Sequence, residues 1–394
     1  MRTTAVLCTA LALVWGLGWA GRASADQTRL PESITLPLAD PMPELVFGHT
    51  PLGAALEKIG KAGQCRILRD PKSTIDLAAP VTGYFPRNTP LRAVLDGVLR
   101  SAGGKEPLTW TLQNKTVVVC CESRAWTDFG VWQPYPNLRG KPEIVRFIKT
   151  ALDVERYGPA LKADAQNLVV KAPLSFQAEL SRLAHWTFCG MKESDWGRLA
   201  YYKERLYGTD VSVEVRAAPA WQGLLEVARR AEVPLVLDEP RLTALGLPVE
   251  KAVTLRLAGV RAAEAVDRIL AATQPTPGKI TAVADAISGG DVLCLTDPRR
   301  VERHVAVFDV TPPALAKLGL SPSDARQGLD TFLEALCRKF GPMAAARGDS
   351  LDDRFAAVLP AHLVCFQSVD TLHEILLFLG PGAALRDGGT QSWY

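Results

Sequence analysis

The chain has 394 residues, of which 47% are hydrophobic and 22% charged, a composition typical of globular proteins rather than of disordered ones. Its 45 Lys and Arg against 42 Asp and Glu give a net charge of only +3, and its nearest approach to a basic stripe is Arg299 and Arg300, so we exclude nucleic-acid binding through phosphate contacts. At about 100–200 residues per domain, the length predicts two to four folded units. No apolar run of about 18 residues follows residue 25, so we expect no transmembrane span in the mature chain.

Residues 1–25 have the pattern of a signal peptide. Arg2 precedes an apolar run over residues 5–20, and the small residues of Ala23-Ser24-Ala25 form a cleavage signal. We expect cleavage between Ala25 and Asp26 and export of the mature protein to the periplasm or cell envelope. A retained, uncleaved anchor stays open as the alternative, because a charged residue lies close to the cut.

The cysteines do not indicate a disulfide framework. Eight are present, and removal of the signal peptide takes Cys8 with it, which leaves an odd number with irregular spacing. Cys120 and Cys121 follow a strand-like run, in which neighbouring side chains point to opposite faces. We therefore favour buried thiols over a structural disulfide. The mature cysteines are Cys65, Cys120, Cys121, Cys189, Cys294, Cys337 and Cys365.

Two long segments share one pattern, which predicts an internal duplication. Each has a helix after a proline, a short strand ended by Asp, a Val-Thr strand, a second helix and a closing strand. In the first copy we expect Thr50 to be the N-cap and Pro51 to lie in the first turn. The matching pairs are Pro51 with Pro219, Leu56 with Leu224, Ile59 with Val227, Ile67 with Leu235, Asp70 with Asp238, Leu95 with Val266, Asp96 with Asp267, Val98 with Ile269 and Leu99 with Leu270.

A second pattern follows each of these segments. It has a first strand before a proline, a helix with an apolar stripe, a last strand and a final helix. The matching pairs are Phe129 with Phe308, Val131 with Val310, Ile148 with Leu333, Asn167 with His362, Val170 with Cys365 and Leu183 with Phe378.

We therefore expect an α+β protein of four small tandem modules in the order A-B-A-B, each a small split sheet packed with two helices. We expect module A1 over residues 41–122, B1 over 123–190, A2 over 211–298 and B2 over 299–380, with a linker helix over 191–210 and a tail over 381–394. The linker helix is expected to lie on both halves. Each half, one A-B pair, is expected to fold by itself.

The A modules resemble the secretin and TonB short N-terminal domain (STN domain). The motifs that carry the resemblance are TPLGAALEKI, LRDP, VTGYF and TPLRAVLDGVL. The stretch LDEPRLTALGLPVEKAVTLRLAGVRAAEAVD is similar to exported proteins of planctomycete-type bacteria that contain this domain. The B modules resemble the secretin N-terminal repeat (secretin N-domain), through VFDVTPP and LVCFQSVDTLHEILLFL.

The resemblance implies interaction roles. In secretins such modules stack into periplasmic rings below an outer-membrane barrel, and in TonB-dependent receptors the short domain binds a signalling partner. Only a short stretch follows Leu379, so we expect neither a barrel nor a receptor here, and both roles are analogies.

The sequence does not indicate catalysis. It has no G-x-S-x-G and no P-loop, and Gly103-Gly104-Lys105 lacks the flanking residues of the latter. The best acidic pairs, Asp70 with Asp96 and Asp238 with Asp267, recur in both copies, which fits roles in turns and on helix surfaces. We therefore expect no enzyme, no catalytic residue and no cofactor.

Two groups of residues suggest a metal, but the repeat argues against both. His185 and Cys189 lie four apart on an expected helix; His362 and Cys365 lie on an expected strand, with His373 on the next helix. The sister copy replaces the last three residues by Asn167, Val170 and Ala178, so the module does not need them as ligands. We expect no metal site.

The function these observations favour is an exported, non-enzymatic protein-interaction scaffold of the periplasm or cell envelope. Small split sheets leave edge strands that can accept a strand from a partner protein. One alternative is a secretin-like accessory that self-associates into a ring in an envelope transport system. Another is an unrecognised hydrolase.

Overall fold

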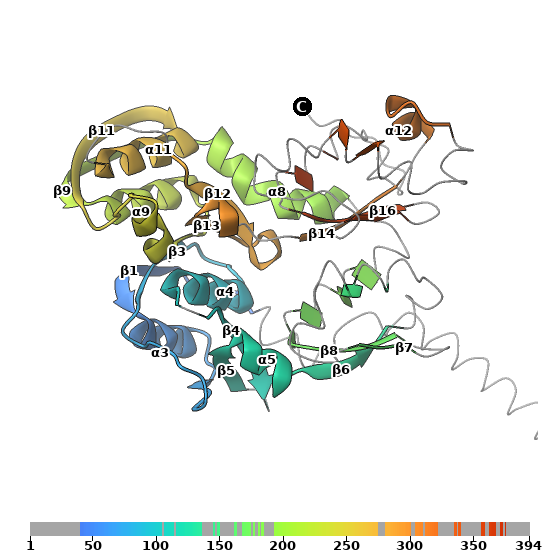
Figure 1. Cartoon of the computed structure of the whole chain (residues 1–394). Coiled ribbons are helices and arrows are strands. Elements are labelled where there is room, and N and C mark those ends of the chain that lie inside the picture. The colour runs from blue at the N-terminus through green and yellow to red at the C-terminus, as the bar shows by residue number, and fades with distance from the viewer. Residues whose placement is uncertain are drawn as a thin grey trace, which may run out of the picture.

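The computed structural model describes residues 40–135 except 105, 114 and 115, residues 193–300 except 275–279, and parts of the B segments, among them 161–163, 168–174, 304–309, 312–321, 356–358 and 362–367. The expected cleavage site at Ala25 and Asp26 and the tail over 381–394 lie outside these residues. From here A1, B1, A2 and B2 denote only the residue ranges given above. The fold is a mixed α/β arrangement of small sheets (Figure 1). Within the described part, no helix is both long and apolar enough to cross a bilayer.

A1 contains the helices and strands that its periodicity predicts, with two further strands. The first helix begins one residue later than expected: Pro51, not Thr50, is the N-cap, and no side chain caps it. The buried face of this helix is Leu52, Ala55, Leu56 and Ile59, as the spacing predicts. The elements are β1 (Leu45–Pro51), α3 (Leu52–Ala62), β2 (Ile67–Arg69), β3 (Pro80–Phe85), α4 (Leu91–Ala102), β4 (Leu108–Gln113), β5 (Thr116–Cys121) and α5 (Glu122–Thr127).

A2 has the same order of elements and adds the short helix α10 after its second strand and the 3-10 helix η2 before its last strand. Pro219 is again the N-cap of the first helix. The elements are β9 (Asp210–Pro219), α9 (Ala220–Ala231), β10 (Leu235–Leu237), α10 (Glu239–Ala244), β11 (Ala252–Arg261), α11 (Ala262–Thr273), β12 (Val283–Ile287), η2 (Ser288–Gly290), β13 (Val292–Thr296) and η3 (Pro298–Arg300).

The strands of A1 and A2 join in one five-stranded sheet of order β1-β3-β10-β13-β12. Its seam is the antiparallel pair β3 and β10, in which Gly83 lies opposite Val236. The remaining strands of A1 form the sheet β2-β5-β4, and those of A2 form the two-stranded ribbon of β9 and β11. Figure 1 shows A1 directly beside A2, with β3 at their boundary.

The shared sheet has a different core on each face. On one face, Leu235 and Leu237 pack with the helices of A2. On the other face, Val236 and Cys294 of A2 belong to the same cluster as Val98 of helix α4 in A1. The strands of A2 are therefore covered on one side by a helix of A1. Either half alone would expose a face that the other now covers, which argues against the expectation that each half folds by itself; that expectation stays a prediction.

A helix, α8 (Glu193–Gly208), occupies most of the 191–210 segment. Leu199 and Leu206 are buried, and the helix packs against α11, β12 and η2, all in A2. The Arg205 guanidinium donates to the Ala231 carbonyl at 2.6 Å, which ties α8 to the end of α9. The packing described for α8 therefore attaches it mainly to A2 rather than equally to the two halves.

The B segments each contribute a three-stranded antiparallel sheet to the described structure. B1 has β6 (Val131–Pro134), β7 (Leu161–Ala163) and β8 (Leu168–Ala172), in the order β6-β8-β7. B2 has β14 (His304–Asp309), α12 (Pro312–Lys317), β15 (Ala356–Val358) and β16 (His362–Gln367), with the strands in the order β14-β16-β15.

The register corrects one matching pair in the B segments. Val131 lies opposite Ala172, and His304 lies opposite Gln367. If the last strands correspond as the sequence predicts, Val131 matches His304 rather than Val310. The prolines that follow Val131 and Val310 therefore do not occupy matching positions in B1 and B2.

The described cysteines behave as buried thiols. Cys65, Cys120, Cys121 and Cys294 are outside any disulfide, and all but Cys65 are buried. Burial raises the pKa of Cys120 to about 12, with a smaller contribution from the nearby Asp70 carboxylate, so its thiol stays protonated at neutral pH. The side chains of Cys189, Cys337 and Cys365 lie outside the described residues.

Candidate functional site

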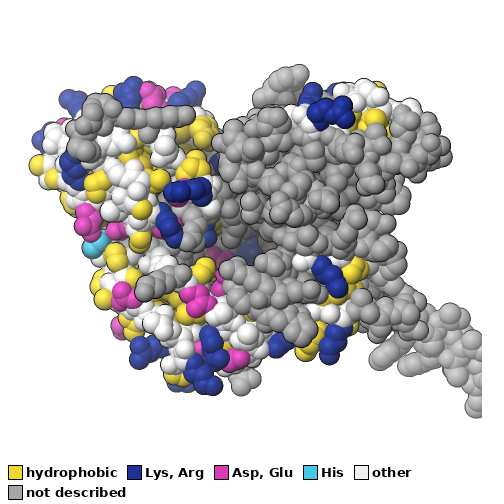
Figure 2. Space-filling view, in the orientation of Figure 1, with side chains coloured by type: hydrophobic (Ala, Val, Ile, Leu, Met, Phe, Trp, Pro, Cys, Tyr) yellow, Lys and Arg dark blue, Asp and Glu magenta, His cyan; other side chains and the backbone are white. Residues whose placement is uncertain are grey.

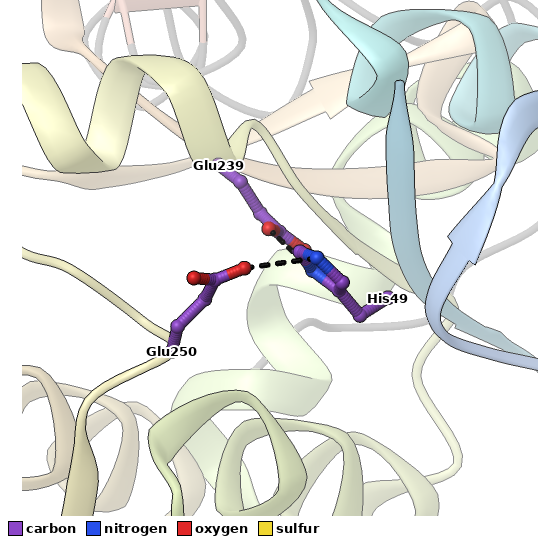
Figure 3. Close-up of side chains that lie close together, drawn as sticks. All are labelled: His49, Glu239 and Glu250. Carbon is purple, nitrogen blue, oxygen red and sulfur yellow. Dashed lines mark hydrogen bonds and ion pairs between the residues drawn. The ribbon is translucent and has the colours of Figure 1, made fainter. Parts of the chain in front are cut away.

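The most concentrated group of chemically active side chains lies where A1 meets A2. His49 comes from β1 of A1, Glu239 is the first residue of α10, and Glu250 lies in the turn before β11. One potential ligand atom from each residue lies within 4.8 Å of the others. Figure 3 shows the His49 ring between the two carboxylates, with a dashed line to each. We call these three residues the seam cluster.

A bulge in β1 places His49 at this position. The pairing of β1 with β3 shifts register between Phe47 and Thr50, and His49 has the left-handed backbone angle φ = 52°. The preceding residue must be small, since a Cβ on Gly48 would lie 2.8 Å from the Trp221 ring of α9. The bulge therefore brings the chain against A2 and carries the imidazole to its edge.

Glu239 is the buried member of the seam cluster, with only 5% of its surface exposed. The Thr82 hydroxyl of β3 donates to its Oε1 atom, and the His49 backbone N–H donates to Thr82 Oγ1 at 3.0 Å. The His49 ring contacts the other oxygen, Oε2, at 3.1 Å through Nδ1. Thr82 thus fixes the carboxylate so that its second oxygen faces the imidazole.

Glu250 is the exposed member of the seam cluster. Its Oε1 atom lies 2.9 Å from His49 Nε2, and both side chains are accessible to solvent. Such an exposed ion pair contributes about 0–1 kcal/mol by itself. Its value to the structure is therefore small, and its side chain can move without disturbing the core.

The contacts of the seam cluster require a further proton or a cation. Both ring nitrogens of His49 face a carboxylate oxygen at about hydrogen-bond distance. A neutral imidazole has one donor and one acceptor nitrogen, so one of the two contacts would set lone pair against lone pair. Either an imidazolium, a protonated carboxyl or a bound metal ion resolves this conflict. The arrangement can hold a proton or a divalent cation between A1 and A2.

Other polar contacts reinforce the same boundary. The Ser101 hydroxyl of α4 donates to the Leu237 carbonyl of β10 at 2.7 Å. The Ser288 hydroxyl donates to Asp96 Oδ2 at 2.5 Å, and Arg92 forms an ion pair with Asp291. Together these bonds link helix α4 to the strands and turns of A2.

The aspartates weighed as acid–base pairs have structural partners. Asp70 accepts hydrogen bonds from the Ser73 hydroxyl at 2.7 Å and from Arg124 at 3.1 Å. Burial alone would raise its pKa, but these bonds and the Lys72 N–H outweigh it and hold the pKa of Asp70 below the usual range. Asp96 accepts from the Trp110 ring N–H at 2.6 Å. Burial raises the pKa of Asp267, with the nearby Glu264 as a second cause.

Asp238 accepts from the Thr296 hydroxyl at 2.9 Å. The structure therefore does not bring Asp70 and Asp96, or Asp238 and Asp267, together through any hydrogen bond among the described residues. Asp70 instead bonds Ser73 and Arg124, Asp238 bonds Thr296, and Asp96 bonds Trp110 and, across the boundary between A1 and A2, Ser288.

The metal suspects named from the sequence are only partly within the described structure. His362 and Cys365 lie on β16, a strand as expected, but their side chains lie outside the described residues. His185, Cys189 and His373 lie outside them altogether. The seam cluster was missed because its members come from both copies and share no short spacing. One signal was available: the repeat pairs His49 with Ala217, so the histidine is peculiar to A1.

Comparison of the chain with family models, with curated proteins and with solved structures finds no match.

Proposed function

We propose that the chain is an exported, non-enzymatic protein-interaction scaffold of the periplasm or cell envelope, built as an A-B-A-B duplication. The observation that carries the proposal is the β3–β10 seam, in which one segment of this chain already recognises another by adding a strand to the edge of its sheet. Strand addition of this kind is a general mode of protein recognition.

Backbone details support the duplication. Three left-handed residues of A1 have left-handed counterparts at matching positions of A2, although the residue types differ. Such positions are costly for most residues and do not recur by chance at several matching sites. The pairs are His49 with Ala217, Gln64 with Glu232 and Asn88 with Gly259.

Strand registers support it as well. Phe47 lies opposite Gly83 in A1, and Val215 lies opposite Leu255 in A2, as the repeat predicts. The three-stranded part has the same order and directions in both copies, with one parallel and one antiparallel pair. The resemblance to STN domains and secretin N-domains belongs to the same proposal, since both are interaction modules.

The ribbon of β9 and β11 is the edge best suited to a partner. Its two strands have 10 residues each, and neither has a second strand neighbour among the described residues. Their buried side chains, such as Val213 and Leu257, face the helices of A2, and Arg256 is exposed. A partner segment in extended conformation could therefore pair along β11 without disturbing the core.

A photo-crosslinking residue at Arg256 tests this proposal in the native cell envelope. We expect a crosslink to a partner protein, identified by mass spectrometry of the joined peptides. The matched control carries the same photo-crosslinker at Arg268, exposed on α11 beside the ribbon. Equal crosslinking from both positions, or none from Arg256, would contradict recognition through the ribbon edge.

The ring alternative has less support. Repeating the seam between two copies would place β11 of one beside β2 of the next. Within the chain, Gly83 lies opposite Val236; between two copies, the matching residues Leu255 and Leu68 would lie opposite each other. Arg256 and Arg69 would also bring like charges to the same interface. We therefore expect light scattering of the mature protein to give the mass of a single chain, and a ring-sized particle would favour the alternative.

A further inference from the structure

We propose that the seam cluster binds one divalent transition-metal ion, with Zn²⁺ as the probe, and that the ion fastens A1 to A2. The donor set is one imidazole nitrogen from His49 and one carboxylate oxygen each from Glu239 and Glu250. Imidazole with carboxylates suits Zn²⁺ better than Mg²⁺ or Ca²⁺, which prefer oxygen ligands alone. This reverses the expectation of no metal site.

The geometry needs only a small adjustment. In a tetrahedral zinc site with bonds of about 2.1 Å, ligand atoms lie about 3.4 Å apart. The ligand atoms of the seam cluster all lie within 4.8 Å of one another. His49 and Glu250 are accessible side chains, so rotation of the ring and of the carboxylate can close the remaining distance. The buried Glu239 would then be the fixed ligand.

An outer hydrogen bond holds that fixed ligand as metal sites usually require. Thr82 donates to Oε1 of Glu239, which leaves Oε2 directed at His49 and available to an ion. The two carboxylates also carry negative charge, and a neutral imidazole has no positive charge to balance it. A metal ion would replace the proton that the cluster otherwise needs.

The ligands come from both sides of the seam, so binding should stabilise the joined state. His49 lies on β1 of A1, whereas both carboxylates belong to A2. An ion that binds only the assembled seam stabilises it by RT ln(1 + c/Kd) at a free ion concentration c, so the melting temperature rises with the logarithm of that concentration once it exceeds the Kd. Metal binding would thus reinforce the β3–β10 strand pairing between A1 and A2. It does not depend on the proposed scaffold role.

The test is zinc titration by calorimetry of the full mature chain after removal of bound metal. Thiols and other histidines of the chain can also bind zinc, so the observable is the difference between variants. We expect wild-type protein to bind one more equivalent than His49→Ala or Glu250→Gln, and zinc to raise the melting temperature of wild type alone. Titration with Co²⁺ should give a His49-dependent spectrum without a thiolate charge-transfer band.

Two controls keep the test decisive. Glu57→Gln removes a similarly exposed carboxylate from α3, where Glu57 pairs with Lys61 rather than with the seam cluster, and should leave zinc binding unchanged. His49→Ala should fold, since Ala217 has nearly the same left-handed backbone, and His49→Asn is a second variant that favours this conformation. Equal zinc stoichiometry and affinity in wild type and in the folded His49 variants would overturn the proposal.

Discussion

A1 and A2 have the same strand orders and the same buried helix faces, yet the surfaces that meet at the seam differ. On A1, Gly83 and Gly97 let Val236 of A2 approach so closely that a Cβ on either would lie 2.8 Å or 3.1 Å from its Cγ1 atom. The matching residues of A2 are Leu255 and Arg268, which leave no such space. The two segments therefore agree in their buried helix faces and differ in the surfaces that meet, where A1 is shaped to cover A2.

Replacing Gly83 at the seam is expected to lower the stability most. Gly83→Leu installs the A2 residue in A1 and should lower the free energy of unfolding by about 3 kcal/mol or more, because the side chain has no space beside Val236. The matched control, Leu255→Gly, removes a partly buried side chain from a strand and should cost about 2 kcal/mol, from the lost burial and the freer glycine backbone together. Denaturant melts of both variants measure the contrast, and equal costs would contradict the difference between the surfaces.

The two turn aspartates should differ in their effects. Asp70→Asn weakens bonds from Ser73 and Arg124 and should cost about 2 kcal/mol at pH 7. The folded-state pKa of Asp70 is lowered, so its stabilisation is present above the unfolded value of about 3.9 and is lost as the pH falls through the folded value. Melts at pH 7 and pH 3 should therefore show a gap that closes in acid.

Asp238→Asn is the matched variant in A2. One oxygen of Asp238 has no hydrogen-bond partner, and the Thr296 hydroxyl can still donate to an amide oxygen. We expect a smaller cost than at Asp70 when both melts are run at pH 7. A larger cost at Asp238 would mean that the two turns depend on these side chains in the opposite order.

Ser101 at the seam should contribute to stability, whereas a serine at the matching position of A2 should not. Ser101→Ala removes a buried hydroxyl that donates to the Leu237 carbonyl and accepts the Thr82 N–H, so we expect a loss of about 1–2 kcal/mol. The repeat places Ala272 at the matching site, where it is exposed, and Ala272→Ser should change stability by less than about 0.5 kcal/mol. Similar losses in chemical denaturation would argue that Ser101 is not a seam residue.

Replacing a core residue of A1 by its counterpart in A2 should lower the stability only slightly. Leu95 is fully buried on α4, and the matching residue is Val266 on α11. Leu95→Val therefore removes one methylene from a site whose counterpart already holds valine, and should cost about 1 kcal/mol. A loss in the melt as large as that of Gly83→Leu would show that core and seam are not distinguished in the way proposed.

The sequence predicted α3, α4, α9 and α11 because each has one apolar face, but it did not predict the short helices α5 and α10. The spacing of Leu52, Leu56 and Ile59 identified α3, and the repeat identified its counterpart in A2. Strands β1, β4, β9 and β12 were not predicted, although β9 alternates buried and exposed residues along Asp210–Pro219. Apart from its first residue, that segment was assigned to A2, but without a predicted strand.

The seam could not be predicted by the same means. Gly83 and Val236 are far apart in the sequence, and they touch only because Gly83 has no side chain. The spacing of apolar residues along the chain does not reveal such a contact. The seam cluster has the same difficulty, since His49 meets Glu239 and Glu250 only after the two copies join. The repeat does show where the copies differ, and these differences mark the surfaces that specialised.

Separating the halves tests the central claim, that A1 and A2 form one body through the β3–β10 seam, most directly. Residues 26–192 and 193–394 are produced as two polypeptides, so that α8 stays with A2, and their thermal melts are compared with that of the intact chain. If the seam joins A1 and A2, neither half alone will reproduce the cooperative transition of the full chain, and mixing the two will restore it. Two independent transitions at the midpoint of the full chain, with no association on mixing, would contradict it.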